Sequence, residues 1–461
     1  MTSTLQVHLA DVGQPGFDLP RQKPTIPADT YLARLDALYA AMSERALDGL
    51  VVYGDREHFA NIAYLTGFDP RWEEALLVLI PGRTPRLVVG NENVSYAAVV
   101  PFGIDVVRLA KFSLVGQPDP GDVTLTDVLK DAGLASAIAS VGLIGWKFWS
   151  SENAAGWIEL PHFIVEQISA LVSSVENATD LLMRPGTGLR LENDVDQIAY
   201  FEFAGSHASA GIRRLITGIR PGMTELEASQ LMRPILLPFS YHPTMLSGPN
   251  AAYGVASAND RILQVGDPVA AGLGYWGGNT ARAGFLVEEA SQLPEGAGDY
   301  LERLAVPYYD TAAAWYETIR IGLTAGELYD VTFSRIGDPF YGIYLNPGHF
   351  IHLDEWPVSP VSKGSTVVFR SGNAVQLDII PITGSAYHTA QIEDGIVLAD
   401  EDLRASLAAR YPDVWTRIEL RRDRLKNTFG IELHSEVLPL SDAAGWFPPF
   451  WLAPQLSLVR G

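Results

Sequence analysis

Side chains that can move protons or bind cations are concentrated in two stretches of this 461-residue sequence. The stretch GHFIHLDEWP contains His349 and His352, three residues apart. The stretch QLDIIPITGSAYHTAQIEDGIVL carries Asp378 and Glu393 on apolar, strand-like segments. Because an imidazole held near carboxylates can act as a general base near neutral pH, these four residues are our candidate catalytic groups.

Paired acidic groups in a cleft also favour a cationic ligand, such as a guanidinium or an ammonium. We expect the substrate to contact five further polar or aromatic residues of these regions: Tyr253, Asn279, His242, His388 and Trp356. Two of the histidines have a structural alternative. His242 precedes a proline and can complete a turn, and His352 can point to the opposite face of its strand from His349.

Other chemistries find little support in the sequence. No G-x-S-x-G motif occurs, and Ser209 of SHASAG falls on a long helical segment. The glycines of LGYWGGNT lack the spacing of a P-loop or a dinucleotide-binding motif, and no signature of pyridoxal phosphate or haem occurs, so we expect no cofactor. The absence of cysteine excludes disulfides, thiolate ligands and a cysteine nucleophile.

The composition is that of a soluble, globular, two-domain protein, with 47% apolar residues and no apolar run of about 18 residues. The 54 acidic residues outnumber the 33 basic ones and give a net charge of −21. A negative field of this size repels phosphate backbones and anionic lipid, so we expect a small-molecule substrate and no nucleic-acid or membrane partner. The N-terminus has no signal-peptide pattern, which favours a cytoplasmic location.

The N-terminal half has the pattern of an α/β domain. After a polar, proline-rich arm (residues 1–28), Asp29 or Thr30 is expected to cap a helix. Continuous apolar runs then alternate with helical segments, which predicts a sheet covered on both faces over residues 29–182. The runs are GLVVYG (49–54), ALLVLI (75–80), RLVVG (86–90) and SVGLIGW (140–146).

The second domain is expected over residues 190–461, after the linker MRPGTG, and begins with a long amphipathic helix that ends at Gly218. The stretches IRPGMTELE (219–227) and IRIGLTAGE (319–327) each close one helix and open another with a Thr-x-x-Glu capping box. This repeat indicates a duplicated unit whose two halves are related by an internal pseudo-two-fold axis.

The C-terminal region contains two further features. The mixed charges of residues 415–429 predict a helix with a solvated face. The aromatic segment GWFPPFWLAP (445–454) would be unfavourable in water, so it either packs on the chain's own surface or contacts a second subunit.

The order of these stretches, from NAAYGV (250–255) to GHFIHLDEWP and QIEDGIVL, resembles the creatinase / aminopeptidase P / methionine aminopeptidase superfamily (M24), and NIAYLTGFDP (61–70) is similar to the signature of its N-terminal domain. The resemblance covers roughly residues 30–400. It implies a creatinase-like α/β domain followed by a pita-bread domain of class α/β (α+β), and a homodimer. It also implies that the loop Gly67–Trp72 could touch substrate, although a simple turn is equally consistent.

Metal-dependent members of this superfamily bind two ions with two Asp, one His and two Glu. The resemblance carries these positions onto Gly272, Asn279, His349, Asp378 and Glu393, respectively. Glycine offers no ligand atom and an amide is a weak, neutral donor, so we expect no dinuclear metal site. Two histidine positions of the family fall on Val255 and Trp356, and Arg282 at the family's arginine position is expected to be structural.

These observations lead to one main hypothesis and two alternatives. The leading hypothesis is a metal-independent hydrolase, or a lyase, that cleaves a C–N or related bond in a small nitrogen-containing molecule, with His349 or His352 moving the proton. The first alternative is an Xaa-Pro dipeptidase with a residual mononuclear site at His349, Asp378 and Glu393. The second is a catalytically inactive protein that keeps the fold to bind a ligand or a partner.

Overall fold

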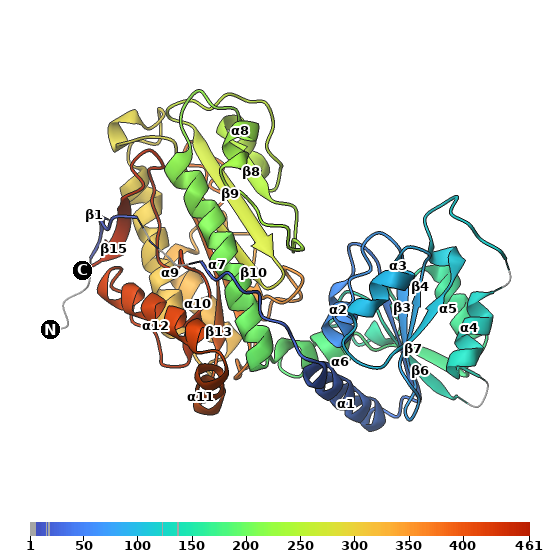
Figure 1. Ribbon diagram of the computed structural model, residues 1–461. Helices are drawn as coiled ribbons and strands as arrows, with labels where there is room; N and C mark the ends of the chain where they lie inside the picture. Colours follow the sequence, from blue (N-terminus) through green and yellow to red (C-terminus); the bar gives the residue numbers. More distant parts are fainter. Residues whose placement is uncertain (1–5, 15, 17–18, 122, 136–137) are drawn as a thin grey trace. The chain divides into compact units, whose positions relative to one another are not determined.

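The computed structural model describes residues 6–461 except 15, 17–18, 122 and 136–137. It divides into two compact units: Ile26–Leu191, and Glu192–Gly461 together with the chain up to Thr25 (Figure 1). The N-terminal segment joins the second of these because β1 (Val7–Asp11) pairs antiparallel with β15 (Leu456–Arg460). Among the described residues, no helix combines the length and apolarity that a membrane crossing requires.

The unit Ile26–Leu191 is built on a six-stranded sheet with the order β5-β4-β3-β2-β6-β7. The expected apolar runs form its strands, and β2 and β3 are buried throughout because helices cover the sheet. The strands are β2 (Gly49–Gly54), β3 (Ala75–Leu79), β4 (Arg86–Val89), β5 (Asp105–Arg108), β6 (Ser140–Ile144) and β7 (Ser174–Asn177). The helices are α1 (Ala28–Glu44), α2 (Ala60–Thr66), α3 (Asn93–Tyr96), α4 (Leu125–Ala132), α5 (His162–Ser169) and α6 (Asp180–Met183).

The start of α1 differs from the sequence prediction. The helix begins at Ala28, and the capping position is Pro27 rather than Asp29 or Thr30. Pro27 has φ −76° and ψ 163°, so its ring fixes a backbone angle that suits the residue before a helix without any side-chain cap. Asp29 lies instead in the first turn, where its charge favours the helix dipole.

The second unit contains a seven-stranded antiparallel sheet with the order β11-β12-β13-β10-β9-β8, and β14 also pairs with β13. Its strands are β8 (Thr244–Ser247), β9 (Pro268–Tyr275), β10 (Gly278–Phe285), β11 (His349–Phe350), β12 (Ala374–Asp378), β13 (Gln391–Leu398) and β14 (Val437–Pro439). The long helix α7 (Val195–Gly218) packs along β9 and β10 (Figure 1). This approach is so close that a Cβ atom on Gly278 would lie 2.2 Å from the backbone nitrogen of Gly205.

The two helix junctions that repeat in the sequence have the same local structure. Thr224 caps α8 (Glu225–Gln230), and Thr324 caps α10 (Ala325–Ile336), which follows α9 (Val306–Thr318). In each junction the threonine hydroxyl accepts the N–H of the glutamate three residues on, at 3.1 and 3.3 Å, and that glutamate accepts the N–H of the threonine. Both predicted capping boxes are therefore confirmed.

The charged C-terminal helix has the expected solvated face, and it also has a buried face that contains an arginine. After α11 (Glu401–Arg410), α12 (Pro412–Asn427) carries Arg421, which is 2% exposed. Its guanidinium lies 2.6 Å from both Glu202 of α7 and Asp442. Burial is tolerated because opposite charges from two other segments surround the arginine.

The aromatic tail packs within its own chain. Trp446, Phe447, Phe450 and Trp451 are at most 2% exposed. The backbone N–H of Trp451 donates to Phe285 on β10, so the tail is also hydrogen-bonded to the central sheet. The alternative of packing on the chain's own surface is the correct one, because these rings leave almost no surface for a subunit contact.

Candidate active site

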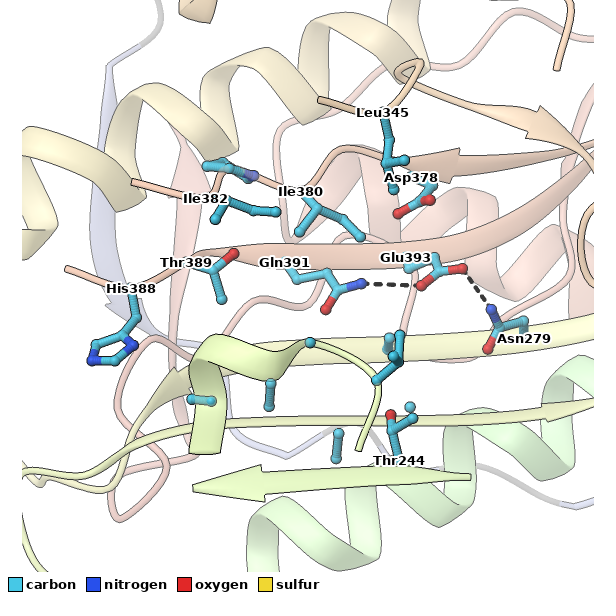
Figure 2. A pocket seen from close by; sticks show the side chains of 18 of the residues that line it. Thr244, Asn279, Leu345, Asp378, Ile380, Ile382, His388, Thr389, Gln391 and Glu393 are labelled. Carbon is cyan, nitrogen blue, oxygen red and sulfur yellow. Dashed lines mark hydrogen bonds between the residues drawn. The ribbon is translucent and has the colours of Figure 1, made fainter. Parts of the chain in front are cut away.

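A cavity of about 850 Å³ opens over the antiparallel sheet of the second unit. Most of its wall is apolar and comes from alanine, valine, leucine, isoleucine and proline side chains. Figure 2 shows Asp378, Glu393 and Asn279 gathered in one part of the cavity, with His388 away from them. An apolar cavity with a few convergent polar groups is the usual form of a small-molecule site.

The strand register explains why these polar groups meet. Glu393 on β13 lies between two neighbouring strands. It is directly opposite Asp378 on β12 on one side and Ala281 on β10 on the other. Side chains two residues apart on a strand share a face, so Asn279 lies on the same face as Ala281. Residues that are far apart in sequence therefore point into one volume.

His349 stands beside this acidic group at the start of β11. Its Nδ1 lies 2.9 Å from the carbonyl oxygen of Phe350, which fixes the ring with Nδ1–H as the donor. Its Nε2 then faces the cavity acids, 3.2 Å from Oε1 of Glu355 and 3.8 Å from Oδ2 of Asp378. The indole of Trp356 stacks on the imidazole, with ring centroids 4.1 Å apart. The histidine is thus held in one orientation from two sides.

Burial and mutual repulsion perturb the proton affinities of these groups. Burial raises the pKa of Asp378 to about 7, with Glu355 adding to the effect and His349 opposing it. Burial and then Asp378 raise the pKa of Glu393 well above its usual range. Burial alone would lower the pKa of His349, but Glu355 and Asp378 together raise it. The site therefore holds exchangeable protons near neutral pH, as acid–base catalysis requires.

Glu393 is held by amide groups. Asn279 donates its Nδ2–H to Oε1 at 2.5 Å, and Gln391 donates to Oε2 at 3.1 Å (Figure 2). Asn279 is itself fixed, because Gln376 donates to its backbone oxygen and Tyr241 donates its hydroxyl to Oδ1 at 2.8 Å. Burial and the nearby carboxylates raise the pKa of Tyr241 well above 10, so its hydroxyl stays neutral.

The residues present do not fit a dinuclear metal centre. Gly272 provides no ligand atom, and Asn279 directs its Nδ2–H donor at Glu393 while its Oδ1 already accepts from Tyr241. One ion is a different case. His349, Asp378 and Glu393 each offer a ligand atom, and the three atoms lie within 4.8 Å of one another. Their geometry is compatible with a single ion.

The structure brings some of the expected site residues together and separates others. His242, which is exposed, and half-buried His388 line the cavity, as does Trp356. Burial lowers the pKa of His388, whose backbone adopts φ 54°. The side chain of Tyr253 lies outside the described residues.

Neither His349 nor His352 is among the described residues that line the cavity. Of the two, His349 is the one that contacts the acidic residues of the cavity, Glu355 and Asp378. His352 is fully buried, and its ring packs edge-on against Phe201 of α7, with centroids 5.1 Å apart. Arg282 is also buried, where it pairs with Asp394 at 2.6 Å and donates to the carbonyl oxygens of Trp446 and Ala443. These contacts give Arg282 the structural role that the sequence suggested.

Three residues of the site were not among the sequence candidates: Tyr241, Glu355 and Gln391. Glu355 had a signal, because it is the acidic residue six positions after His349 in the same stretch. Tyr241 and Gln391 had none. Their contacts with Asn279 and Glu393 exist only after the strands are aligned.

Three kinds of similarity to known proteins agree with this architecture. The family model for the creatinase/prolidase N-terminal domain matches residues 34–154. The chain is 20% identical over 382 residues to the uncharacterized peptidase YqhT of Bacillus subtilis (strain 168), a match that covers 80% of this chain and 96% of that protein. Solved structures with similar folds include an Xaa-Pro dipeptidase from Bacillus anthracis, with TM-score 0.61, 18% identity, and 81% and 96% of the two chains covered. The prolidase of Pyrococcus horikoshii OT3 gives the same TM-score and identity, with 80% and 95% covered.

At these identities the structural matches describe the fold. That fold is a creatinase-like N-terminal domain followed by a pita-bread domain. The family model identifies a creatinase/prolidase N-terminal domain over residues 34–154, and the rest of the chain shares its fold with the solved structures named above.

Proposed function

We propose that this protein hydrolyses a C–N bond in a small nitrogen-containing molecule, with His349 and Glu355 as the proton-transfer pair and without a dinuclear metal centre. The observation that carries the proposal is the 3.2 Å approach of Nε2 of buried His349 to Glu355, which lines the largely apolar cavity. A buried imidazole fixed in one orientation beside a carboxylate is a general acid–base arrangement.

The hydrogen bonds around the cavity favour a ligand that donates N–H groups and carries positive charge. The hydroxyl of Tyr241 and the amide groups of Asn279 and Gln391 already donate to other residues of the site. In contrast, the buried Oδ1 of Asp378 has no hydrogen-bond partner among the described residues. A cationic nitrogen group would satisfy this oxygen, and the apolar wall would take the rest of the molecule.

A cationic ligand bound beside Asp378 would also favour the neutral form of His349, which is the form that acts as a base. Glu355 and Asp378 raise the pKa of His349, and a positive ligand beside them would oppose that effect. Neutral His349 then accepts a proton from water through Nε2 as the water oxygen bonds to the carbon. The C–N bond breaks as the His349 imidazolium, stabilised by the adjacent Glu355 carboxylate, gives that proton to the leaving nitrogen, while ionised Asp378 keeps its contact with the cationic group.

A second candidate function rests on the cluster of His349, Asp378 and Glu393. If this cluster binds one divalent ion, the protein would act on Xaa-Pro peptides, as the names of several similar structures suggest for those proteins. The ion would supply Lewis-acid chemistry, while Glu355, which is not one of the three ligands, would orient the substrate.

The test is turnover measured after chelation and after reloading with Mn²⁺ or Zn²⁺. Substrates would be Xaa-Pro dipeptides, creatine-like compounds and cyclic amidines, with Glu355→Gln as the variant. Metal-free turnover of a nitrogen compound that Glu355→Gln abolishes supports the proposal, and activity only on reloading favours the second candidate. Ligand binding without any turnover would mean that the chain is a binding protein. We also propose, on the resemblance alone, a cytoplasmic homodimer, which sedimentation and cell fractionation test.

A further inference from the structure

Tyr241 occupies the space that a side chain at position 272 would need. A Cβ atom built on Gly272 would lie 2.5 Å from the Tyr241 hydroxyl oxygen, well inside van der Waals contact. A Cβ atom on Gly274 would lie 2.4 Å from Cε1 of the same ring. Two glycines on one face of β9 therefore make room for one tyrosine, which reaches β9 from the segment that precedes β8.

The tyrosine also acts on Glu393 through Asn279. Its hydroxyl donates to Asn279 Oδ1 at 2.8 Å, and Asn279 directs Nδ2–H at Glu393, 2.5 Å away. The two contacts agree on one orientation of the amide, in which Glu393 faces a hydrogen-bond donor.

We propose that Tyr241 and Asn279 together replace one ion of a two-metal centre: Tyr241 fills the position of the missing carboxylate at residue 272, and Asn279 gives Glu393 the donor that a cation would otherwise supply. Tyr241 is thus a positioning residue. This inference goes beyond the proposed reaction, because it holds whether the protein is a hydrolase or a binding protein.

The first experiment restores the two carboxylates with and without the tyrosine. The double variant Gly272→Asp/Asn279→Asp keeps Tyr241, and the triple variant adds Tyr241→Ala. Mn²⁺ binding is measured by calorimetry, with metal content by mass spectrometry. We expect the triple variant to bind one Mn²⁺ per chain more than the native protein and the double variant to gain none. A gain in both variants, or in neither, would overturn the proposal.

The second experiment measures the steric part alone, in case the acidic variants do not fold. Gly272→Ala is made in the native protein and in Tyr241→Ala, and the melting temperature is recorded for each. We expect Gly272→Ala to lower the melting temperature by several degrees in the native background and by much less without the tyrosine. Gly298→Ala is the matched control, because a Cβ atom there meets nothing within 4 Å. Equal losses in the two backgrounds would contradict the inference.

Discussion

The substitution Glu202→Gln tests how much the buried ion pairs between α7 and α12 stabilise the fold. Glu202 is fully buried, and its carboxylate forms ion pairs with Arg421 at 2.6 Å and with Arg417 at 2.5 Å. Glutamine keeps the volume but removes the charge, so both arginines lose their shared carboxylate. Breaking a buried ion pair from one side costs about 3–5 kcal/mol. Arg421 keeps Asp442 and Arg417 is 20% exposed, so we place the loss near the lower end, about 3 kcal/mol.

The assay is thermal and urea unfolding of the native protein and the variant. A loss of about 3 kcal/mol corresponds to a melting temperature lowered by roughly 3–5 °C, because the unfolding entropy is about 2 cal/mol/K per residue. The control is Glu432→Gln, which removes an exposed carboxylate 2.7 Å from Lys426 and should change nothing measurable. If Glu202→Gln is no more harmful than Glu432→Gln, the reasoning on the buried network is refuted.

The pH dependence of this effect has a definite sign. Burial alone would raise the pKa of Glu202, but Arg421 and Arg417 hold it below its ordinary value. A carboxyl group with a lowered pKa in the folded state stabilises the protein fully above its unfolded pKa and loses that contribution as the pH falls through the folded pKa. The difference between native protein and Glu202→Gln should therefore be largest near neutral pH and shrink in strong acid.

Three further predictions concern the site and its frame. His349→Gln should lower turnover about 10²–10⁴-fold with the fold intact, because His349 faces the acidic residues of the cavity. His352→Gln should mainly lower the melting temperature, because His352 packs against Phe201. Kinetics and thermal unfolding distinguish the two effects. Asp378→Asn should weaken the binding of a cationic ligand by about 2–5 kcal/mol, as measured by calorimetry. Equal affinity of the native protein and the variant would mean that the cation binds elsewhere. Thr324→Ala should cost about 1 kcal/mol in urea unfolding, since it removes a helix cap, and no loss would mean that water replaces the cap.

Local patterns in the sequence predict the elements of the fold well. The continuous apolar runs at 49–54 and 75–80 became β2 and β3, because buried strands need no polar face. The Thr-x-x-Glu pairs at Thr224 and Thr324 depend on residues only three apart, and both formed. The predicted cap of α1 was two to three residues too late, because a proline can occupy the capping position without a side-chain hydrogen bond.

Features that depend on distant contacts could not be predicted in this way. The burial of Arg421 could not be predicted locally, because Glu202, its buried partner, is 219 residues away in the chain. The gathering of His349, Asp378 and Glu393 followed from the resemblance, but the contact of Tyr241 with β9 required the fold itself. The sequence thus located most of the acidic groups of the site and left open what fills the space between them.

The most direct test of the account is the metal stoichiometry of the native protein. The protein would be purified without chelator, reloaded with Mn²⁺, Zn²⁺, Fe²⁺ or Co²⁺, and analysed by mass spectrometry for metal bound per chain. The account predicts that no condition yields two tightly bound ions, because Gly272 offers no ligand and Tyr241 and Asn279 occupy that half of the site. Two equivalents bound per chain would contradict it.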